Sequence, residues 1–139
     1  MPIEFIRPDW RVPGHVRAVS LTRAGGLSKG AFSSLNLGDH VGDVPAHVAA
    51  NRALVREQLQ LPAEPAWLKQ VHGCDVVAAS GDDDRTPRRA DAAVASRSGR
   101  VCVVMTADCL PALFCDEQGL VVAAAHAGWR GLLNGVLEA

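Results

Sequence analysis

The chain has 139 residues, of which 48% are apolar and 21% are charged, a composition typical of a folded domain rather than of a disordered chain. Its 14 Lys and Arg nearly balance its 15 Asp and Glu, so the net charge is −1, which gives no electrostatic indication of binding to nucleic acid or to an anionic membrane. The longest apolar run, Leu120–Ala125, is too short to cross a bilayer, and the first ten residues lack the apolar region of a signal peptide. We therefore expect a cytoplasmic protein with reduced cysteines and a single domain over residues 1–139.

The first half predicts one strand, one helix and then two shorter strands. A strand is expected over His15–Thr22, before a glycine-rich stretch of turns. A helical pattern covers Pro45–Gln60, with Asp43 or Val44 at its N-cap. Its buried stripe is expected to contain Val48, Ala49, Ala53, Val55 and Leu59. Short strands over Ala66–Val71 and Asp75–Ala79 should bracket a turn at His72–Gly73.

The second half predicts more strands. The polar segment Ser80–Arg89, with three consecutive aspartates, is typical of an exposed loop. Three apolar segments without alternation indicate strands buried on both faces: Val101–Thr106, Leu110–Cys115 and Leu120–Ala125. A helix should follow from Gly128, with Trp129, Leu132, Leu133, Val136 and Leu137 on its apolar side.

The tetrapeptide Asp116–Gly119 between the last two strands indicates a tight hairpin turn. If Asp116 pairs with Gly119, continuing the pairing places Cys109 directly opposite His126 on one face of the hairpin. A slip of one residue in this register would send the two side chains to opposite faces. Turn chemistry therefore predicts a thiol and an imidazole in contact.

A facing Cys and His suggest two kinds of site. The first is a metal site for zinc or copper, with His72 in its glycine-containing turn as the best candidate for a third ligand and an open fourth position for water. The second is a Cys109–His126 dyad, in which the thiolate attacks an acyl or amide carbon. In either scheme Asp108 could orient a group or move a proton. A metal-stabilised binding module without catalysis is a third hypothesis.

The remaining polar residues have ordinary interpretations. Cys74, Cys102 and Cys115 are of a residue type that is often buried, and His15, His40 and His47 need no special role. The glycine-rich stretch does not match a nucleotide-binding P-loop. Arg23 and Arg130, each beside glycines, are candidates for binding phosphate, although a surface ion pair explains either equally well.

A series of short motifs, in order from about Ser20 to the end of the chain, resembles one family closely. The motifs are Thr22–Ser28 (TRAGGLS), Asn36–Asp43 (NLGDHVGD), Asn51-Arg52, Leu68–Gly73 (LKQVHG), Ala90–Ala92 (ADA), Thr106–Pro111 (TADCLP) and His126–Gly131 (HAGWRG). This string is similar to the YfiH/YlmD family, long labelled polyphenol oxidase or laccase-domain proteins. The resemblance implies an α/β (α+β) sandwich with mixed β-sheets, a fold similar to the catalytic domain of cytotoxic necrotizing factor toxins.

The resemblance also implies a function and a metal. It suggests a purine nucleoside phosphorylase, acting on adenosine, inosine, guanosine and methylthioadenosine, with metal-dependent adenosine deaminase activity. The implied ligands of zinc, or alternatively copper, are His72, Cys109 and His126. The implied substrates are a purine nucleoside and phosphate. A cysteine hydrolase, or a polyphenol oxidase with bound copper, is the alternative, although five His are too few for a multicopper cluster. Members of the family continue for nearly as much chain again, so a partial domain, truncated at its C-terminus, is expected.

Overall fold

A computed structural model describes residues 2–79 and 86–139 of the chain. These residues form two compact units, and each unit is made of one short and one long segment of the chain. The first consists of Met1–Arg11 and Arg17–Leu61, and the second of Val12–Val16 and Pro62–Ala139. Among the described residues, no helix has both the length and the apolar character that a membrane span requires.

The first unit contains a two-stranded antiparallel ladder between β1 (Phe5–Ile6) and β2 (Ser20–Leu21), a 3-10 turn, η1 (Gly30–Phe32), and the helix α1. Its core includes Ile3, Leu35 and Val55. The strand expected over His15–Thr22 is confirmed at Ser20–Leu21 and is wrong for residues 15–19 and for Thr22. Residues 12–16 belong instead to the second unit, where the His15 ring makes a hydrogen bond with the carbonyl of Gly119.

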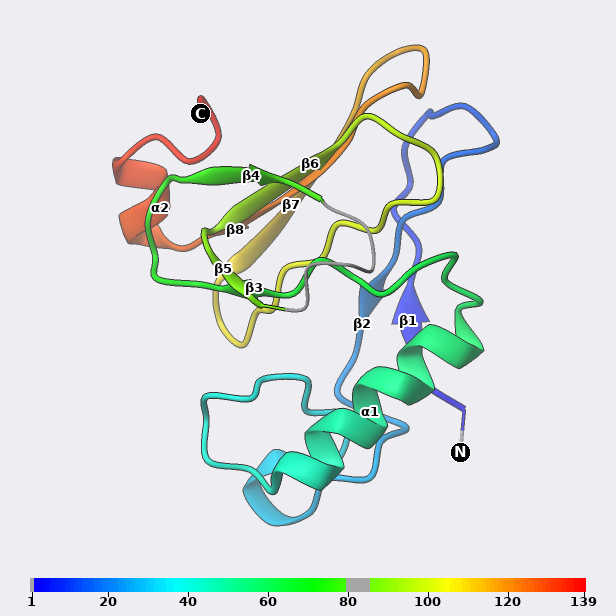
Figure 1. Ribbon diagram of the computed structural model, residues 1–139, viewed down its shortest axis with the longest axis vertical. Helices are drawn as coiled ribbons and strands as arrows, with labels where there is room; N and C mark the ends of the chain where they lie inside the picture. The colour runs from blue at the N-terminus through cyan, green and yellow to red at the C-terminus, as the bar shows by residue number, and fades with distance from the viewer. Residues whose placement is uncertain (1, 80–85) are drawn as a thin grey trace. The chain divides into compact units, whose positions relative to one another are not determined.

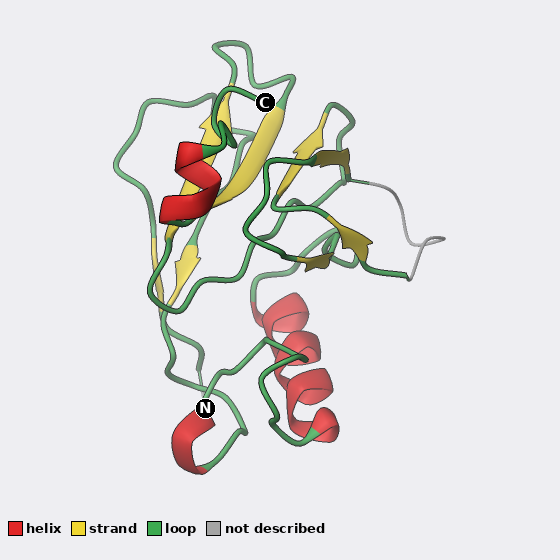
Figure 2. Cartoon of the chain, turned by 90° about the vertical axis from the view of Figure 1, so that its left-hand side faces the viewer, coloured by secondary structure: helices red, strands yellow, loops and turns green. Residues whose placement is uncertain are grey.

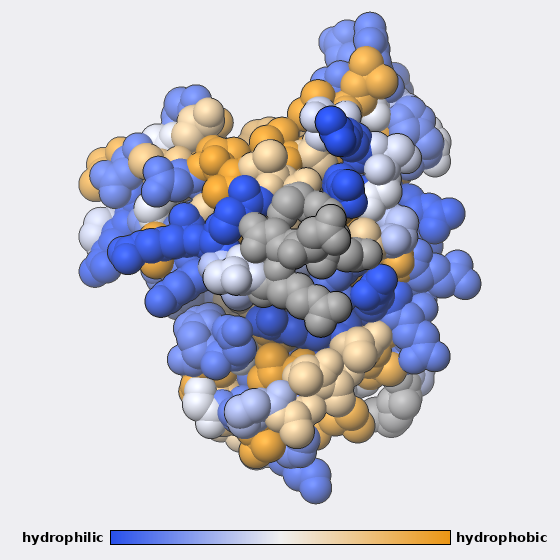
Figure 3. Space-filling view, viewed as in Figure 1, coloured by the Kyte–Doolittle hydropathy of each residue, from blue (hydrophilic) through white to orange (hydrophobic). Residues whose placement is uncertain are grey.

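Helix α1 (Pro45–Gln58) agrees closely with the helical pattern of the sequence. Val44 is its N-cap in extended conformation, and Pro45 occupies the first turn, where its missing N–H costs nothing. The buried stripe is narrower than expected, because Ala49 and Ala53 are exposed. Figure 3 shows pale orange atoms over α1 on the face turned to the viewer. Alanine loses no side-chain entropy in a helix, so Ala49 and Ala53 stabilise α1 although they are exposed.

A buried amide holds the loops of the first unit onto α1. Asn51 is completely buried, and its Oδ1 accepts a hydrogen bond from the backbone N–H of Leu27 at 2.8 Å. Its Nδ2 donates to the hydroxyl of Ser28 at 2.9 Å and to the carbonyl of Asn36 at 2.8 Å. Ser28 in turn donates to Asp43 at 2.6 Å. One helix residue thus satisfies polar groups on two loop segments, as a buried polar group requires.

The second unit is built on a four-stranded mixed sheet in the order β4-β6-β8-β7 (Figure 1). Its strands are β4 (Val76–Ala78), β6 (Ala92–Ala95), β7 (Leu110–Cys115) and β8 (Val122–Ala127). β4 pairs with β6 in parallel, whereas β8 is antiparallel to both of its neighbours. A separate parallel pair joins β3 (Leu68–Lys69) to β5 (Arg88–Arg89). The expected mixed α+β fold with mixed sheets is confirmed.

Two segments differ from the sequence prediction. Val101–Thr106 is not a strand: Cys102 makes one isolated bridge, with Ala66. Further along, the backbone of Met105 pairs with a side chain, since the Gln70 amide accepts from its N–H and donates to its carbonyl, each at 2.7 Å. The polar segment Ser80–Arg89 is not all loop, because Arg88 and Arg89 form β5. Its residues 80–85 lie outside the described part of the chain.

Burial is also less complete than the apolar segments suggested. β8 is mostly buried, but β7 is an edge strand, so Leu110 and Phe114 remain 68% and 41% exposed. The helix α2 (Trp129–Leu133) lies beside the sheet and follows β8 directly (Figure 2). Of the five residues expected on its apolar side, Val136 is buried, and the other four, Trp129, Leu132, Leu133 and Leu137, are exposed. A helix of five residues presents too short a stripe to bury them all.

Candidate metal centre

The hairpin of β7 and β8 brings Cys109 and His126 to one face, although its register differs from the prediction. Pro111, not Cys109, is the partner of His126. The loop is longer than expected because Asp116 pairs with Val121, and its carboxylate accepts the N–H groups of Leu120 and Val121. Two extra loop residues shift the register by two. An even shift preserves the alternation of faces, so the two side chains remain diagonal neighbours.

The residue that does lie opposite Cys109 in this extended register is Gly128. A Cβ atom on Gly128 would lie 2.8 Å from Sγ of Cys109 and 3.4 Å from Cδ2 of His72. Real Cβ atoms are essentially never found closer than 3.0 Å to another heavy atom. The backbone of Gly128 is extended, with φ −78° and ψ 171°, so glycine is needed there for space and not for conformation.

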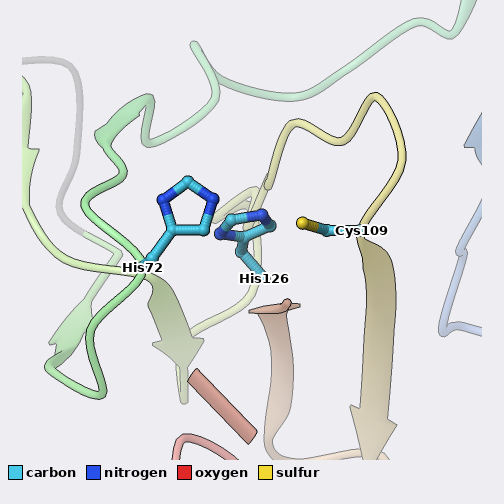
Figure 4. Close-up of side chains that lie close together, drawn as sticks. All are labelled: His72, Cys109 and His126. Carbon is cyan, nitrogen blue, oxygen red and sulfur yellow. The ribbon is translucent and has the colours of Figure 1, made fainter. Parts of the chain in front are cut away.

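His72 completes the group from the turn between β3 and β4. Figure 4 shows His72, His126 and Cys109 gathered together, with Cys109 at the start of β7 and His126 near the end of β8. One potential ligand atom from each of the three lies within 4.8 Å of the others. The two rings meet edge to face, with centroids 4.8 Å apart. His72 is exposed, Cys109 is half-buried and His126 is buried, so the group opens toward solvent on one side.

A fully buried carboxylate, Asp91, lies behind the group. Its Oδ2 accepts a hydrogen bond from Nδ1 of His126 at 2.8 Å. It also accepts the backbone N–H groups of Val71, His72 and Gly73 at 2.8 to 3.0 Å. Burial raises the pKa of Asp91, but the hydrogen bond from His126 and the three backbone N–H groups together outweigh burial and lower it. Asp91 is therefore ionised and accepts all four bonds.

The donor set fits a transition metal. One thiol and two imidazoles are ligand types that suit zinc and copper, and three protein ligands leave a further position open. The bond from His126 to a buried carboxylate is the outer contact that metal-binding histidines commonly make. The space left by Gly128, the Asp91 bond and the convergence of three ligands are separate observations, and each agrees with a metal site.

The other candidate residues, Asp108, Arg130 and Arg23, differ in how they relate to the group. Asp108 is exposed, with one carboxylate oxygen 4.0 Å from Sγ of Cys109. Arg130, in α2, is exposed, and its guanidinium lies 5.2 Å from the ring centroid of Trp129. Arg23 belongs to the first unit, where its Nε donates to the carbonyl of Ser33. Its assignment to phosphate stays a prediction.

Asp91 and Gly128 were not predicted from the sequence to take part in the site. Asp91 could have been singled out because it is the one acidic residue in the apolar segment Ala90–Ala95, beside β6. An unpaired charge is costly in such a buried segment, so Asp91 needs partners. For Gly128, the signal was a glycine two residues after His126, on the same face of an extended strand. Both inferences would have needed the correct hairpin register, or contacts between distant segments.

Comparison with known proteins identifies the family to which this fold belongs. The family described as multi-copper polyphenol oxidoreductase laccase matches residues 17–139. A purine nucleoside phosphorylase of Pseudomonas aeruginosa is 54% identical over 97% of this chain, and the purine nucleoside phosphorylase YfiH of Escherichia coli is 53% identical over the same share. The match covers 54% and 55% of those two proteins, so the chain spans about half the length of these relatives.

Solved structures agree with these sequence matches. A Neisseria meningitidis protein superposes with a TM-score of 0.89 at 52% identity, covering 96% of this chain and 54% of that protein. YlmD from Geobacillus stearothermophilus gives a TM-score of 0.75 at 34% identity, covering 84% of this chain and 46% of that one. The fold and site define a mixed α+β protein with a candidate metal centre. The chain belongs to the YfiH/YlmD family of laccase-domain proteins.

Proposed function

We propose that this chain carries the metal centre of a purine nucleoside phosphorylase, with His72, Cys109 and His126 as the ligands of a zinc ion. The convergence of these three side chains within 4.8 Å is the observation that carries the proposal. It is supported by relatives named purine nucleoside phosphorylase at about half sequence identity. When bound, zinc supplies Lewis-acid activation at its open position.

The reaction assigned to this site is attack of phosphate on the anomeric carbon of the ribose. The new bond forms between a phosphate oxygen and C1′, and the glycosidic C–N bond breaks with its electron pair on the purine. The leaving purine needs a proton or a nearby positive charge. We assign Asp108, whose carboxylate lies beside Cys109, to take the proton that attacking dihydrogen phosphate gives up and pass it to the leaving purine. We assign Arg130 to hold phosphate, because it follows the cluster on α2.

A second activity at the same centre is hydrolytic deamination of adenosine. Water adds at C6 of the purine, and ammonia leaves with the electron pair of the broken C–N bond. Both activities place the base of the nucleoside near the three ligands. They differ in their products, which allows one experiment to report on both.

The test combines metal content with product analysis. Purified protein should contain about one zinc per chain, and the Cys109→Ala variant should contain much less. With adenosine and phosphate, the protein should release adenine and ribose 1-phosphate, and inosine if it also deaminates. Gly14→Ala provides a control, because a Cβ at Gly14 has no neighbour within 4 Å. Undiminished turnover in both Cys109→Ala and His126→Ala would refute the proposal.

A cysteine hydrolase is the second candidate, because the Asp91 bond to His126 also suits a thiol activated by an imidazole. In that case Sγ of Cys109 bonds to an amide carbon, and His126 takes the thiol proton and gives it to the amine that leaves as the C–N bond breaks. Water then hydrolyses the thioester and regenerates the thiol. The two proposals differ in metal content. Metal-free protein whose Cys109 is rapidly alkylated by iodoacetamide would favour the hydrolase, whereas stoichiometric zinc that protects Cys109 would favour the phosphorylase.

Oxidation of polyphenols by a multicopper cluster fits the described residues poorly. All five His of the chain lie in its described part, and among the described residues the group of potential metal ligands contains two of them, His72 and His126. His15 bonds to the carbonyl of Gly119, while His40 and His47 lie in the first unit beside Asp39 and Asp43. A single site of three ligands has a higher intrinsic affinity for copper than for zinc, so copper uptake alone would not indicate oxidase function.

A further inference from the structure

Asp91 connects two ligand-bearing segments that are distant in sequence. It is completely buried, and the backbone of His126 also donates to its carbonyl at 2.7 Å. One carboxylate therefore contacts both the turn that carries His72 and the ring of His126. Neither segment contains Asp91, and both are held by its carboxylate. These contacts indicate that Asp91 positions the two histidines.

The first part of this positioning concerns the backbone of the His72 turn. His72 has φ +60°, a left-handed conformation that costs free energy for a residue with a side chain. The N–H groups of Val71, His72 and Gly73 all point at the Asp91 carboxylate. Successive N–H groups in such a turn form a small anion-binding nest, and here a side chain of the same protein fills it. The carboxylate thus holds His72 in the conformation that directs it to the cluster.

The second part concerns the tautomer of His126. Both oxygens of Asp91 accept backbone N–H groups, so Asp91 is the acceptor at this site, and Nδ1 of His126, 2.8 Å from Oδ2, carries the proton that it donates. The lone pair of a neutral ring is then on Nε2. A neutral imidazole binds metal through the nitrogen that has no proton, so this bond decides which nitrogen is available.

We propose that Asp91 is the positioning residue of the metal centre: through one carboxylate it fixes the conformation of the His72 turn and the tautomer of His126 before any metal binds. Its relevance to metal binding rests on the proposed function. The tautomer itself does not, because it is a property of the metal-free protein.

The experiment uses Asp91→Asn in the whole chain, with two readouts. The amide oxygen of the variant, in the place of Oδ1, can still accept from Val71 and Gly73. Its NH2 group, in the place of Oδ2, loses the bond from the N–H of His72 and donates to Nδ1 of His126. In metal-free protein labelled with 15N-histidine, NMR should show His126 protonated at Nδ1 in the wild type and at Nε2 in the variant. Zinc affinity, measured by competition with a chromophoric chelator, should fall about ten- to hundredfold.

Asp43→Asn is the matched control. Asp43 is also a buried carboxylate, but it accepts its bonds from Ser28, Asn36 and Val44 in the first unit. This variant should leave both the His126 tautomer and the zinc affinity unchanged. A general loss of stability would affect both variants, whereas a positioning role changes the tautomer in Asp91→Asn alone.

Each outcome decides a separate question. A wild-type His126 protonated at Nε2 overturns the inference, and this measurement does not depend on whether Asp91→Asn folds. Asp91→Asn with wild-type tautomer and zinc affinity within twofold of wild type overturns it as well. Wild-type protein that binds no zinc would instead refute the proposed function, while the tautomer result would still test the role of Asp91.

Discussion

Replacing Gly128 by Ala tests the geometry of the candidate metal centre with one methyl group. That methyl would lie 2.8 Å from Sγ of Cys109, whereas ordinary contacts of this kind lie at about 3.5–4.0 Å. The sulfur must therefore move by about 0.7 Å or more. Metal-ligand distances are held to within about 0.2 Å, so the displaced sulfur can no longer reach the position that the two imidazoles define.

The expected effect is a loss of zinc affinity with little loss of fold. We expect the affinity to fall about ten- to hundredfold, equivalent to about 1.4–2.8 kcal/mol of binding free energy. The backbone at Gly128 is extended, so alanine meets no conformational strain there. Alanine is a poorer helix N-cap than glycine, which costs at most about 1 kcal/mol of stability.

The assay is chelator competition at neutral pH, with far-ultraviolet circular dichroism to confirm the fold. Gly14→Ala is the control, because it adds the same methyl in the same unit where nothing lies within 4 Å. If Gly128→Ala binds zinc within twofold of both the wild type and Gly14→Ala, then Cys109 is not a ligand in the arrangement described, and the reasoning fails.

Three further predictions concern the units that carry the site. Asn51→Ala should lower the free energy of unfolding by about 3 kcal/mol, measured in urea, because it leaves several buried polar groups without partners; a loss below about 1 kcal/mol would contradict this. Hydrogen bonds from Asn36 and then Ser28 hold the pKa of Asp43 below its ordinary value of 3.8. The stability they confer should be complete above that value and lost as the pH falls through the lower folded pKa, so wild-type stability should fall more steeply below about pH 4 than that of Asp43→Asn; parallel curves would argue against it. Burial raises the pKa of Cys102 to about 11, so at about pH 8 iodoacetamide should modify this thiol only after unfolding, as peptide mass spectrometry can show; rapid modification of the native protein would be inconsistent with its burial.

Local features of the sequence determined the helix and the hairpin. Helix α1 follows from an initial proline and a repeat of apolar residues, both of which act within a few residues. The strand segment Leu110–Cys115 was predicted with its observed bounds, because its apolar residues end at a clear turn. The approach of Cys109 to His126 also follows from the sequence, since an error of two residues in register leaves both side chains on one face.

Only the tertiary structure decided the exact register, the burial of the apolar segments and the contacts of Asp91. The register depends on how the Asp116 side chain caps its loop, which residue pattern alone does not specify. Burial depends on neighbours, so the edge position of β7 leaves apolar side chains exposed that the sequence would place inside. Asp91 bonds to residues 18–35 positions away. The physical reason is the same in each case: periodicity reports which way a side chain points from its own backbone, whereas a partner distant in the chain is selected only when the elements pack.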